Sequence, residues 1–282
     1  MFDRFARSWT LVRQCLALIA EDRRLLVFPL LSGVAMMIIL GTFAVPALAI
    51  LPSFARHGAI RALPPAAWLG FVAFYWLQFS ILIFFETALI AVAMKRFDGH
   101  PATIGDGLAR AWSRLPAILG FALVAATIGA LLRAIAERVG FLGRIATGLV
   151  GFAWTVATAL VAPVLAAEDV GPLDAIGRSV TLIRTAWGED VIGNVGIGLV
   201  FVVATIGVVG VVGVPAIALI AHLQIALGVL LLALAIVAIA LIALTCSTLN
   251  GVYAASLYRY ANGGRDGGID RAALAQAFVA KH

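Results

Sequence analysis

The sequence predicts an all-α fold, a polytopic membrane helical bundle with six transmembrane helices and cytoplasmic interfacial amphipathic helices. The first observation is composition: 63% of the 282 residues are hydrophobic and 12% are charged, about half the charged share of soluble domains. The second is that apolar residues form six long segments. The third is that Lys and Arg concentrate between alternate pairs of these segments. We therefore expect a single integral membrane domain over residues 1–282.

Each apolar segment reaches the length of about 20 residues that a helix needs to cross a bilayer. Residues 1–24 are charged and amphipathic and lack the pattern of a cleavable signal peptide. We therefore expect the first span to stay in the mature protein. The expected spans are residues 25–51, 67–94, 116–132, 145–167, 191–214 and 227–250.

The distribution of basic residues predicts the orientation. With six spans, 15 of the 20 Lys and Arg residues fall on the side that carries both termini, and 5 fall on the other side. Short loops rich in Lys and Arg stay in the cytoplasm. The sequence therefore predicts a multi-pass protein of the bacterial inner (cytoplasmic) membrane, with the N- and C-termini cytoplasmic.

Short amphipathic helices are expected on the cytoplasmic side before the odd-numbered spans. Residues 2–20, Leu108–Arg114 and Pro172–Thr185 place apolar side chains at helical spacing among charged ones, which is typical of helices that lie in the membrane interface. Residues 269–282 suggest a further short terminal helix. Tryptophans near the predicted boundaries, such as Trp112, are expected to anchor in the interface.

A weak internal repeat accompanies these helices. The tetrapeptides Ala6–Trp9, Ala109–Trp112 and Gly177–Val180 share an arginine at the second position, and each precedes an odd-numbered span. Three parallel units of interfacial helix plus hairpin would explain the pattern. Chance matching in a sequence rich in Ala, Val and Gly would explain it too, and the sequence leaves both open.

Polar residues inside the expected spans map to the cytoplasmic half of the membrane. An ionisable side chain within a span is a candidate functional group. The structural alternative, which we weigh more heavily, is that it bonds to Asn or Thr side chains of neighbouring helices. The candidate intramembrane polar cluster is Glu86, Asn194, Thr245, Ser247 and Asn250.

Two other groups of residues have both a functional and a structural explanation. The arginines Arg7, Arg110 and Arg178 are candidate contacts for lipid head groups, although enforcing topology is the explanation that we prefer for most such residues. The glycines of the fifth span, including Gly207 and Gly210, suggest close helix packing. A flexible or broken helix that lines a site is the alternative.

The sequence holds no catalytic or cofactor signature that we recognise. It lacks a Gly-x-Ser-x-Gly elbow, a His-Glu-x-x-His motif and a phosphate-binding loop. The histidines are scattered, and Cys15 and Cys246 are expected to be free thiols. We therefore expect no cofactor, no metal and no nucleic acid. Membrane lipids are the expected partners, and a membrane-protein partner or a homo-oligomer stays open.

Several stretches resemble a known family. They include Phe5–Gly33, Pro163–Val180 with its Glu-Asp-Val-Gly-Pro motif, Thr185–Phe201 with Trp-Gly-Glu, and Gly268–Phe278. The chain is similar in these stretches to an uncharacterised prokaryotic family of six-span integral membrane proteins, a domain of unknown function. The resemblance implies six spans and brings no catalytic residues.

Three functions are compatible with this sequence. The first is a non-enzymatic membrane scaffold or a protein that interacts with lipid or a small ligand. The second is a transporter or channel with an inner-half polar site around Glu86. The third is a lipid-modifying membrane enzyme, which ranks last because no pair of catalytic groups has a recognisable spacing.

Overall fold

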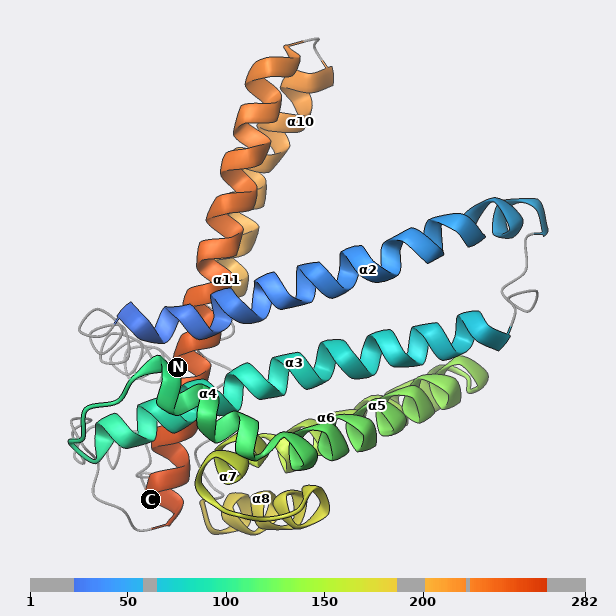
Figure 1. Ribbon diagram of the computed structural model, residues 1–282. Helices are drawn as coiled ribbons and strands as arrows, with labels where there is room; N and C mark the ends of the chain where they lie inside the picture. Colours follow the sequence, from blue (N-terminus) through green and yellow to red (C-terminus); the bar gives the residue numbers. More distant parts are fainter. Residues whose placement is uncertain (1–22, 58–64, 187–200, 222–223, 263–282) are drawn as a thin grey trace, which may run out of the picture. The chain divides into compact units, whose positions relative to one another are not determined.

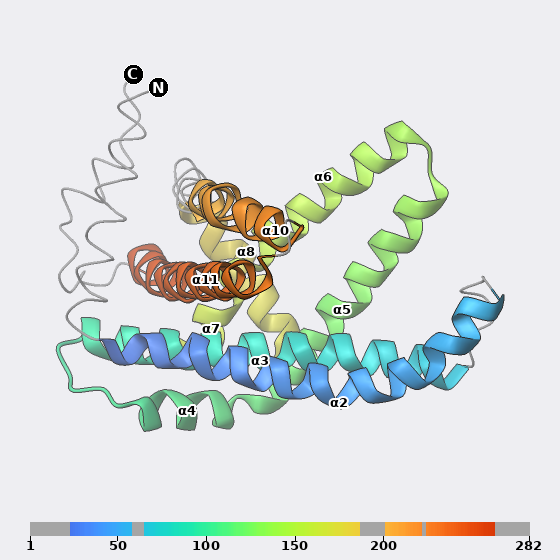
Figure 2. The ribbon, with the colours of Figure 1, turned by 90° about the horizontal axis from the view of Figure 1, so that it is seen from above.

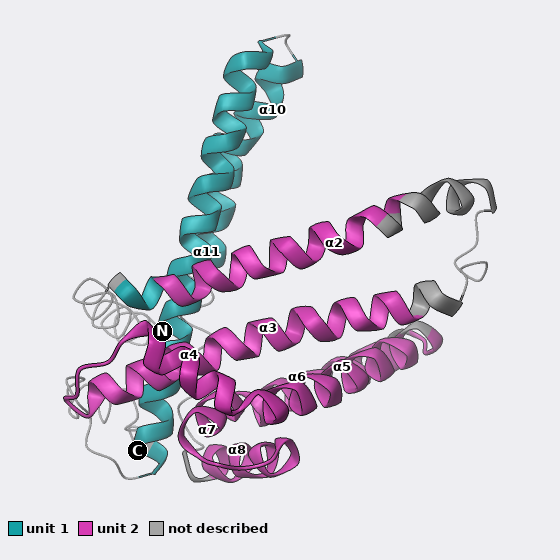
Figure 3. Cartoon of the chain, viewed as in Figure 1, with its two compact units in different colours: residues 1–26, 186–282 teal, residues 27–185 magenta. Residues whose placement is uncertain are grey.

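The computed structural model describes residues 23–57, 65–186, 201–221 and 224–262, and the regular structure in these ranges is entirely helical (Figure 1). The predicted all-α class is therefore confirmed. The chain divides into two compact units: residues 27–185 form one, and residues 1–26 with 186–282 form the other (Figure 3). The single membrane domain over residues 1–282 that the sequence predicts stays a prediction.

The first unit begins with two long antiparallel helices, α2 (Val27–His57) and α3 (Pro65–Phe97). Pro29 lies in the first turn of α2, where a missing N–H costs no helical hydrogen bond. The α2–α3 pair is apolar over most of its length, and one polar contact joins its middle: Gln78 Nε2 donates to the carbonyl oxygen of Met36 at 3.4 Å.

A second hairpin follows, made of α5 (Leu115–Arg138), α6 (Phe141–Thr158) and the short α7 (Val161–Ala167). Trp76 of α3 donates its indole N–H to the carbonyl oxygen of Leu119 in α5 at 3.0 Å. In Figure 2 the two hairpins lie close together at one end of the unit and diverge toward the other. The closed end contains α7, most of whose residues are fully buried.

Two shorter helices, α4 (Ile104–Ser113) and α8 (Pro172–Ala186), lie at this closed end (Figure 1). They occupy the positions at which the sequence predicted helices on the cytoplasmic side. Helix α4 joins α3 to α5, and α8 follows α7, so both connections are on one side of the unit. Two spans, α5 and α6–α7, lie between α4 and α8. An even number of spans returns the chain to the side of the membrane from which it started.

The second unit is a long helical hairpin. It comprises the short η1 (Arg23–Leu26), α-helical residues 201–208, a single π turn η3 (Val209–Gly213), α10 (Val214–Ala221) and α11 (Ile225–Ala261). The sequence predicted that the fifth span ends near residue 214, but the helix continues through Pro215 to Ala221. The π turn ends at Gly213, two residues before Pro215, which has no N–H to donate to the helix.

The close approach within this hairpin does not involve Gly207 or Gly210. A Cβ added at either glycine would meet no atom within 4 Å among the described residues, so the packing role expected for the fifth-span glycines stays a prediction. The approach lies instead at Gly228 of α11, where a Cβ would fall 2.8 Å from the carbonyl oxygen of Ala216 in α10.

In the part of the chain that the structure describes, six helices are long and apolar enough to cross a membrane, which agrees with the predicted number. Most boundaries agree with the expected ones to within several residues. The largest differences are in the fifth span, whose expected start at residue 191 lies outside the described residues, and in the sixth, which extends further. The candidate spans are Arg24–Val45, Leu69–Phe97, Leu115–Ala136, Gly143–Ala167, Phe201–Ala221 and Ile225–Arg259.

Candidate functional site

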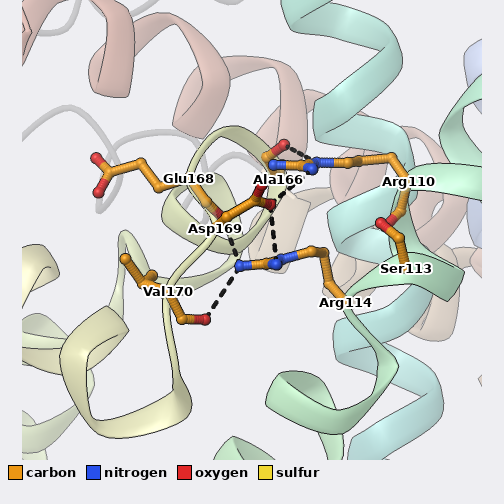
Figure 4. Close-up of polar contacts among 7 residues, drawn as sticks. All are labelled: Arg110, Ser113, Arg114, Ala166, Glu168, Asp169 and Val170. Carbon is orange, nitrogen blue, oxygen red and sulfur yellow. Dashed lines mark hydrogen bonds and ion pairs between the residues drawn. The ribbon is translucent and has the colours of Figure 1, made fainter.

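Charged side chains of the first unit gather at its closed end, where α4 faces the loop between α7 and α8 (Figure 4). This loop contains the Glu-Asp-Val-Gly-Pro motif, residues 168–172. Two arginines of the α4 region, Arg110 and Arg114, extend to it from the other side. We call these two arginines together with residues 166–170 the arginine clasp.

The arginine clasp is held by both charge and backbone contacts. Nη1 of Arg110 and Nη1 of Arg114 each lie 2.9 Å from the same oxygen, Oδ1 of Asp169. Arg110 Nε also donates to the carbonyl oxygen of Ala166 at 2.7 Å. Arg114 Nη2 donates to the carbonyl oxygens of Glu168 and Val170 at 2.8 and 3.1 Å. The two guanidinium groups therefore fix the loop's course and cap the carbonyls at the end of α7.

Exposure differs sharply within the clasp. The side chain of Arg114 is 14% exposed, whereas that of Asp169 is 74% exposed. Water therefore screens the ion pairs from one side, while the arginine-to-carbonyl hydrogen bonds lie on the more buried side. The positioning of the loop depends on the carbonyl contacts at least as much as on the carboxylate.

A second set of contacts fixes the start of α4. Thr103 Oγ1 accepts from the backbone N–H of Asp106, and the Asp106 carboxylate accepts from the backbone N–H of Thr103 at 2.8 Å. This reciprocal pair is a capping box, which satisfies N–H groups that the first turn leaves free. Lys95, near the end of α3, adds an ion pair to Asp106 at 3.0 Å.

These contacts explain the acidity of Asp106. The backbone hydrogen bond from Thr103 comes first, and the hydrogen bond from Lys95 adds to it; together they lower the pKa of Asp106 to about 2. The same contacts that form the capping box and the Lys95 pair therefore favour the ionised carboxylate.

Helix α8 is tied in by different groups. Arg178 Nε donates to Glu168 Oε1 at 3.0 Å. The fully buried Ser179 bridges the junction of α6 and α7, because its hydroxyl accepts from the N–H of Leu160 and donates to the carbonyl oxygen of Ala157. The polar contacts of α8 thus satisfy backbone groups where one helix ends and the next begins.

The arginines that the sequence marked for lipid head groups have protein partners in this structure. Arg110 binds Asp169 and Arg178 binds Glu168, and Arg7 lies outside the described residues. The sequence analysis missed Arg114 and Asp169 as clasp residues. Arg110 and Arg114 are four residues apart on a predicted helix, which places them on one face, and this spacing was the available signal.

The predicted intramembrane cluster is divided between the two units, with Glu86 in the first and Thr245, Ser247 and Asn250 in the second, so it stays a prediction. Glu86 lies in α3, half-buried, on the same face as the buried Ile83 and Ile90. No hydrogen bond or ion pair to its carboxylate is found among the described residues. The hydroxyl of its neighbour Thr87 is also buried without a hydrogen-bond partner there.

The other members of that cluster belong to the second unit. In α11, Thr245 donates to the carbonyl oxygen of Leu241 in its own helix at 2.8 Å, and Ser247 is exposed. Asn250 donates to the sulfur of Cys246 at 3.7 Å. Asn194 lies outside the described residues, so its association with Glu86 stays a prediction. Within the described part of the chain, no group of three His, Cys, Asp or Glu side chains is placed to hold a metal ion.

An all-α chain with six helices of membrane-spanning length and apolarity is a multi-pass membrane protein of the helical class. The chain belongs to the family of unknown function DUF6159, whose sequence pattern matches residues 66–268. The match includes the whole arginine clasp, while the resemblance noted for Phe5–Gly33 lies outside it. No curated protein and no solved structure matches the chain.

Proposed function

We propose that this protein is a non-enzymatic scaffold of the bacterial inner membrane, with both termini in the cytoplasm and with anionic lipid as its ligand. The observation that carries the proposal is the arginine clasp. Its charged groups bind the end of α7 and the loop that follows, at one end of the apolar helices. Contacts that fix the positions of helices, with no group among the described residues placed for catalysis, are typical of a scaffold protein.

Apolar side chains on the outside of this frame support contact with lipid. Trp112 of α4 is 69% exposed and Leu173 of α8 is 67% exposed, and both lie on the short helices beside the clasp. Aromatic and aliphatic groups next to arginines are typical of helices at the membrane interface. A guanidinium has five N–H donors. Among the described residues, the contacts of Arg110 use its Nε and Nη1, which leaves Nη2 for a lipid phosphate.

Reconstitution in nanodiscs tests the lipid interaction. We expect a higher midpoint of thermal unfolding in discs that contain phosphatidylglycerol than in discs of phosphatidylcholine alone, and we expect salt to reduce the difference. Trp112→Ala combined with Arg178→Gln should shrink the difference. Arg144→Gln, at the opposite end of the unit, is the matched control and should not. Equal midpoints in the two lipids would contradict the proposal.

Topology reporters test the orientation. Fusions at His100, Gly171 and His282 should report the cytoplasm, and fusions near Gly58 and Gly140 should report the opposite side. A reporter at His282 that is active outside the cytoplasm would be incompatible with both termini being cytoplasmic.

A transporter or channel is the second candidate, and Glu86 is the observation that favours it. A carboxylate within a membrane span is costly unless it is paired, protonated or hydrated. Among the described residues no partner offsets that cost, and the hydroxyl of Thr87 beside it is buried without a partner as well. Transport would use this residue as a cation or proton site.

A further inference from the structure

The helices of the first unit change in exposure at one level. Among the described residues, α3 has no buried side chain before Ser80, α5 has none after Ala122, and residues 143–159 have none before the buried Leu160. The parts of the helices on the outer side of this level are residues 65–79, 123–138 and 141–159. At about 1.5 Å per residue these parts are about 22 to 29 Å long, close to the hydrocarbon thickness of about 30 Å. We call the level of Ser80, Ala122 and Leu160 the inner boundary.

Helix α8 runs along the inner boundary. Its first residue, Pro172, packs on α5 at Gly120, where a Cβ would fall 2.9 Å from Pro172 Cγ. Two turns later the hydroxyl of Ser179 accepts from the N–H of Leu160 at 3.1 Å and donates to the carbonyl oxygen of Ala157 at 2.7 Å. Gly120 and Ala157 each lie within three residues of the inner boundary. The helix therefore passes from α5 to the α6–α7 junction at one level, across the end of the hairpin and not along it.

Helix α8 has three faces in a regular order. Each buried residue that the structure describes in it follows a polar residue and precedes an apolar one, and these neighbours are all at least partly exposed. The triplets are Asp174–Ala175–Ile176, Arg178–Ser179–Val180 and Thr181–Leu182–Ile183. Because successive residues turn by about 100° around a helix, the polar residues lie on one side of the buried face and the apolar residues on the other. In a helix at a membrane boundary, three such faces meet the protein, the water and the hydrocarbon.

Helix α4 has its faces in the same order. Its triplets are Asp106–Gly107–Leu108 and Arg110–Ala111–Trp112, each with the buried residue in the middle. On the apolar face, Trp112 is 69% exposed, and tryptophan is favoured where a membrane protein meets the head groups. The apolar faces of these two helices are therefore suited to contact with lipid.

Arg184 differs from the other arginines of the closed end. It is exposed and has no ion pair or hydrogen bond among the described residues, whereas Arg110 and Arg178 each bind a carboxylate. It follows Ile183 of the apolar face, and it lies seven residues after the exposed Gly177, so these two positions share the outward side of α8. On this side the apolar face meets the polar face, away from the protein. In a helix at a membrane boundary the line where these faces meet is at the head groups, which a long arginine side chain reaches.

We propose that α8 lies along the cytoplasmic boundary of the bilayer with its apolar face in the hydrocarbon, and that Arg184 binds the phosphate of an anionic lipid there. This inference rests on the lipid interaction proposed above and assigns a residue to it. A guanidinium fits a phosphate because it donates two parallel hydrogen bonds to the phosphate oxygens. The ligand is a lipid and not a soluble phosphate, because the apolar face beside Arg184 holds this side chain in the head-group layer.

A lipid titration of the full-length protein in nanodiscs tests the role of Arg184. The measured quantity is the mole fraction of phosphatidylglycerol that gives half of the rise in thermal midpoint over discs of phosphatidylcholine. Arg184→Gln should raise this fraction about fivefold, the usual effect of one basic residue at an anionic surface, and Arg184→Lys should raise it less. Arg144→Gln removes an exposed arginine at the opposite end of the unit and should leave the fraction unchanged. Arg184 also complements the dipole of α8 from its last turn, but that effect is the same in both lipids and cancels in the rise.

The outcomes separate this inference from the proposed function. If the unmodified protein responds to phosphatidylglycerol and Arg184→Gln responds equally, the assignment of Arg184 is refuted while the lipid interaction stands. If the unmodified protein does not respond, the lipid interaction fails and the assignment fails with it. Inorganic phosphate added to discs of phosphatidylcholine should have no effect. A rise with inorganic phosphate that is lost in Arg184→Gln would identify a soluble phosphate as the ligand and refute the lipid.

Fluorescence quenching tests the position of α8 without reference to the head group. In full-length protein with Cys15→Ser and Cys246→Ser, a bimane on Val180→Cys should be quenched by a nitroxide on the lipid acyl chain. A bimane on the neighbouring Thr181→Cys should be quenched by iodide in the water. Leu131→Cys is the control for acyl-chain quenching, because Leu131 lies in the outer part of α5 and is 58% exposed. Equal quenching at 180 and 181 by each agent, or the reverse pattern, would refute the position of α8 at the boundary.

Discussion

At residue 107 the side chain is a single hydrogen atom, and the neighbouring helix occupies the space beyond it. A Cβ on Gly107 would fall 2.6 Å from the carbonyl oxygen of Ala88 and 2.7 Å from Cγ2 of Val92. Backbone atoms do not give way as a flexible side chain does. The distance between α3 and α4 therefore depends on the absence of a side chain at this position.

We predict that Gly107→Ala lowers the free energy of unfolding by about 1–3 kcal/mol, the usual cost of overpacking. Gly105→Ala in the same helix is the control. A Cβ at residue 105 would meet only Thr103 Oγ1, at 3.6 Å, so that variant should be neutral or slightly stabilising. Chemical denaturation of the two variants in detergent measures the difference. Equal effects would contradict the close approach of α4 to α3.

The acidity of Asp106 leads to a pH prediction. Its pKa is lowered from 3.8 to about 2, so its contribution to stability is complete above about pH 4 and is lost as the pH falls through about 2. Asp106→Asn should therefore be less stable than the unmodified protein at neutral pH, and the gap should close between pH 4 and 2. Thermal midpoints of both proteins across this range provide the measurement. A gap that stays constant through the acid range would mean that the carboxylate charge contributes nothing.

At the scale of elements, the sequence predicted helix positions well and their contacts poorly. Apolar length identified every span, because a bilayer requires about 20 apolar residues, and helical spacing identified α4 and α8. The arginine clasp was not predicted, because Arg110 and Asp169 are 59 residues apart and a single sequence gives no information on which distant charges meet. The glycines of the fifth span have a related limit as a signal: small residues permit close packing but do not specify the partner.

The clasp predicts coupling between α4 and the loop before α8. Arg110→Gln and Asp169→Asn should each destabilise the protein, and the double variant should lose less than the sum, with a coupling of about 1 kcal/mol because the carboxylate is well exposed. Asp169→Asn combined with Arg178→Gln is the control cycle, since Arg178 binds Glu168, and its coupling should be smaller. If the effects of Arg110→Gln and Asp169→Asn on stability simply add, the ion pair between the two residues contributes nothing to stability.

At the scale of the whole molecule, the sequence predicted class, span number and family. These depend on hydropathy and on local motifs such as Glu-Asp-Val-Gly-Pro, which a single chain displays in full. The polar cluster around Glu86 stays a prediction, because depth in a membrane can be counted along the chain while the facing of a helix depends on its neighbours. Thr245 illustrates this, since its hydroxyl bonds within its own helix.

Variants of Glu86 separate the two candidate functions. If Glu86 has the structural role that the sequence predicts, bonded to polar groups of the predicted cluster such as Asn194, Glu86→Gln should be nearly neutral, while Glu86→Leu should cost about 1–3 kcal/mol by leaving those groups unsatisfied. If Glu86 binds a cation or a proton, Glu86→Gln should abolish uptake into proteoliposomes while the thermal midpoint is kept. Measuring the thermal midpoint and the ion flux of Glu86→Gln distinguishes the two functions. Lost flux at an unchanged midpoint would contradict the scaffold proposal.

The π turn at Val209–Gly213 has a consequence for length tolerance. A π turn holds one residue more than an α-helix needs over the same rise, so the hairpin carries a spare residue there. Removing Gly210 should convert the π turn into regular α-helix. The side chains before and after the turn should then keep their present directions. Removing Ala204, in the regular helix before the turn, should rotate the helix on one side of the deletion by about 100° relative to the other. We predict that the Gly210 deletion is inserted and stays folded in membranes, whereas the Ala204 deletion is degraded, and expression with protease resistance compares them. The fifth span can therefore be shortened by one residue at this turn without losing its packing on α11.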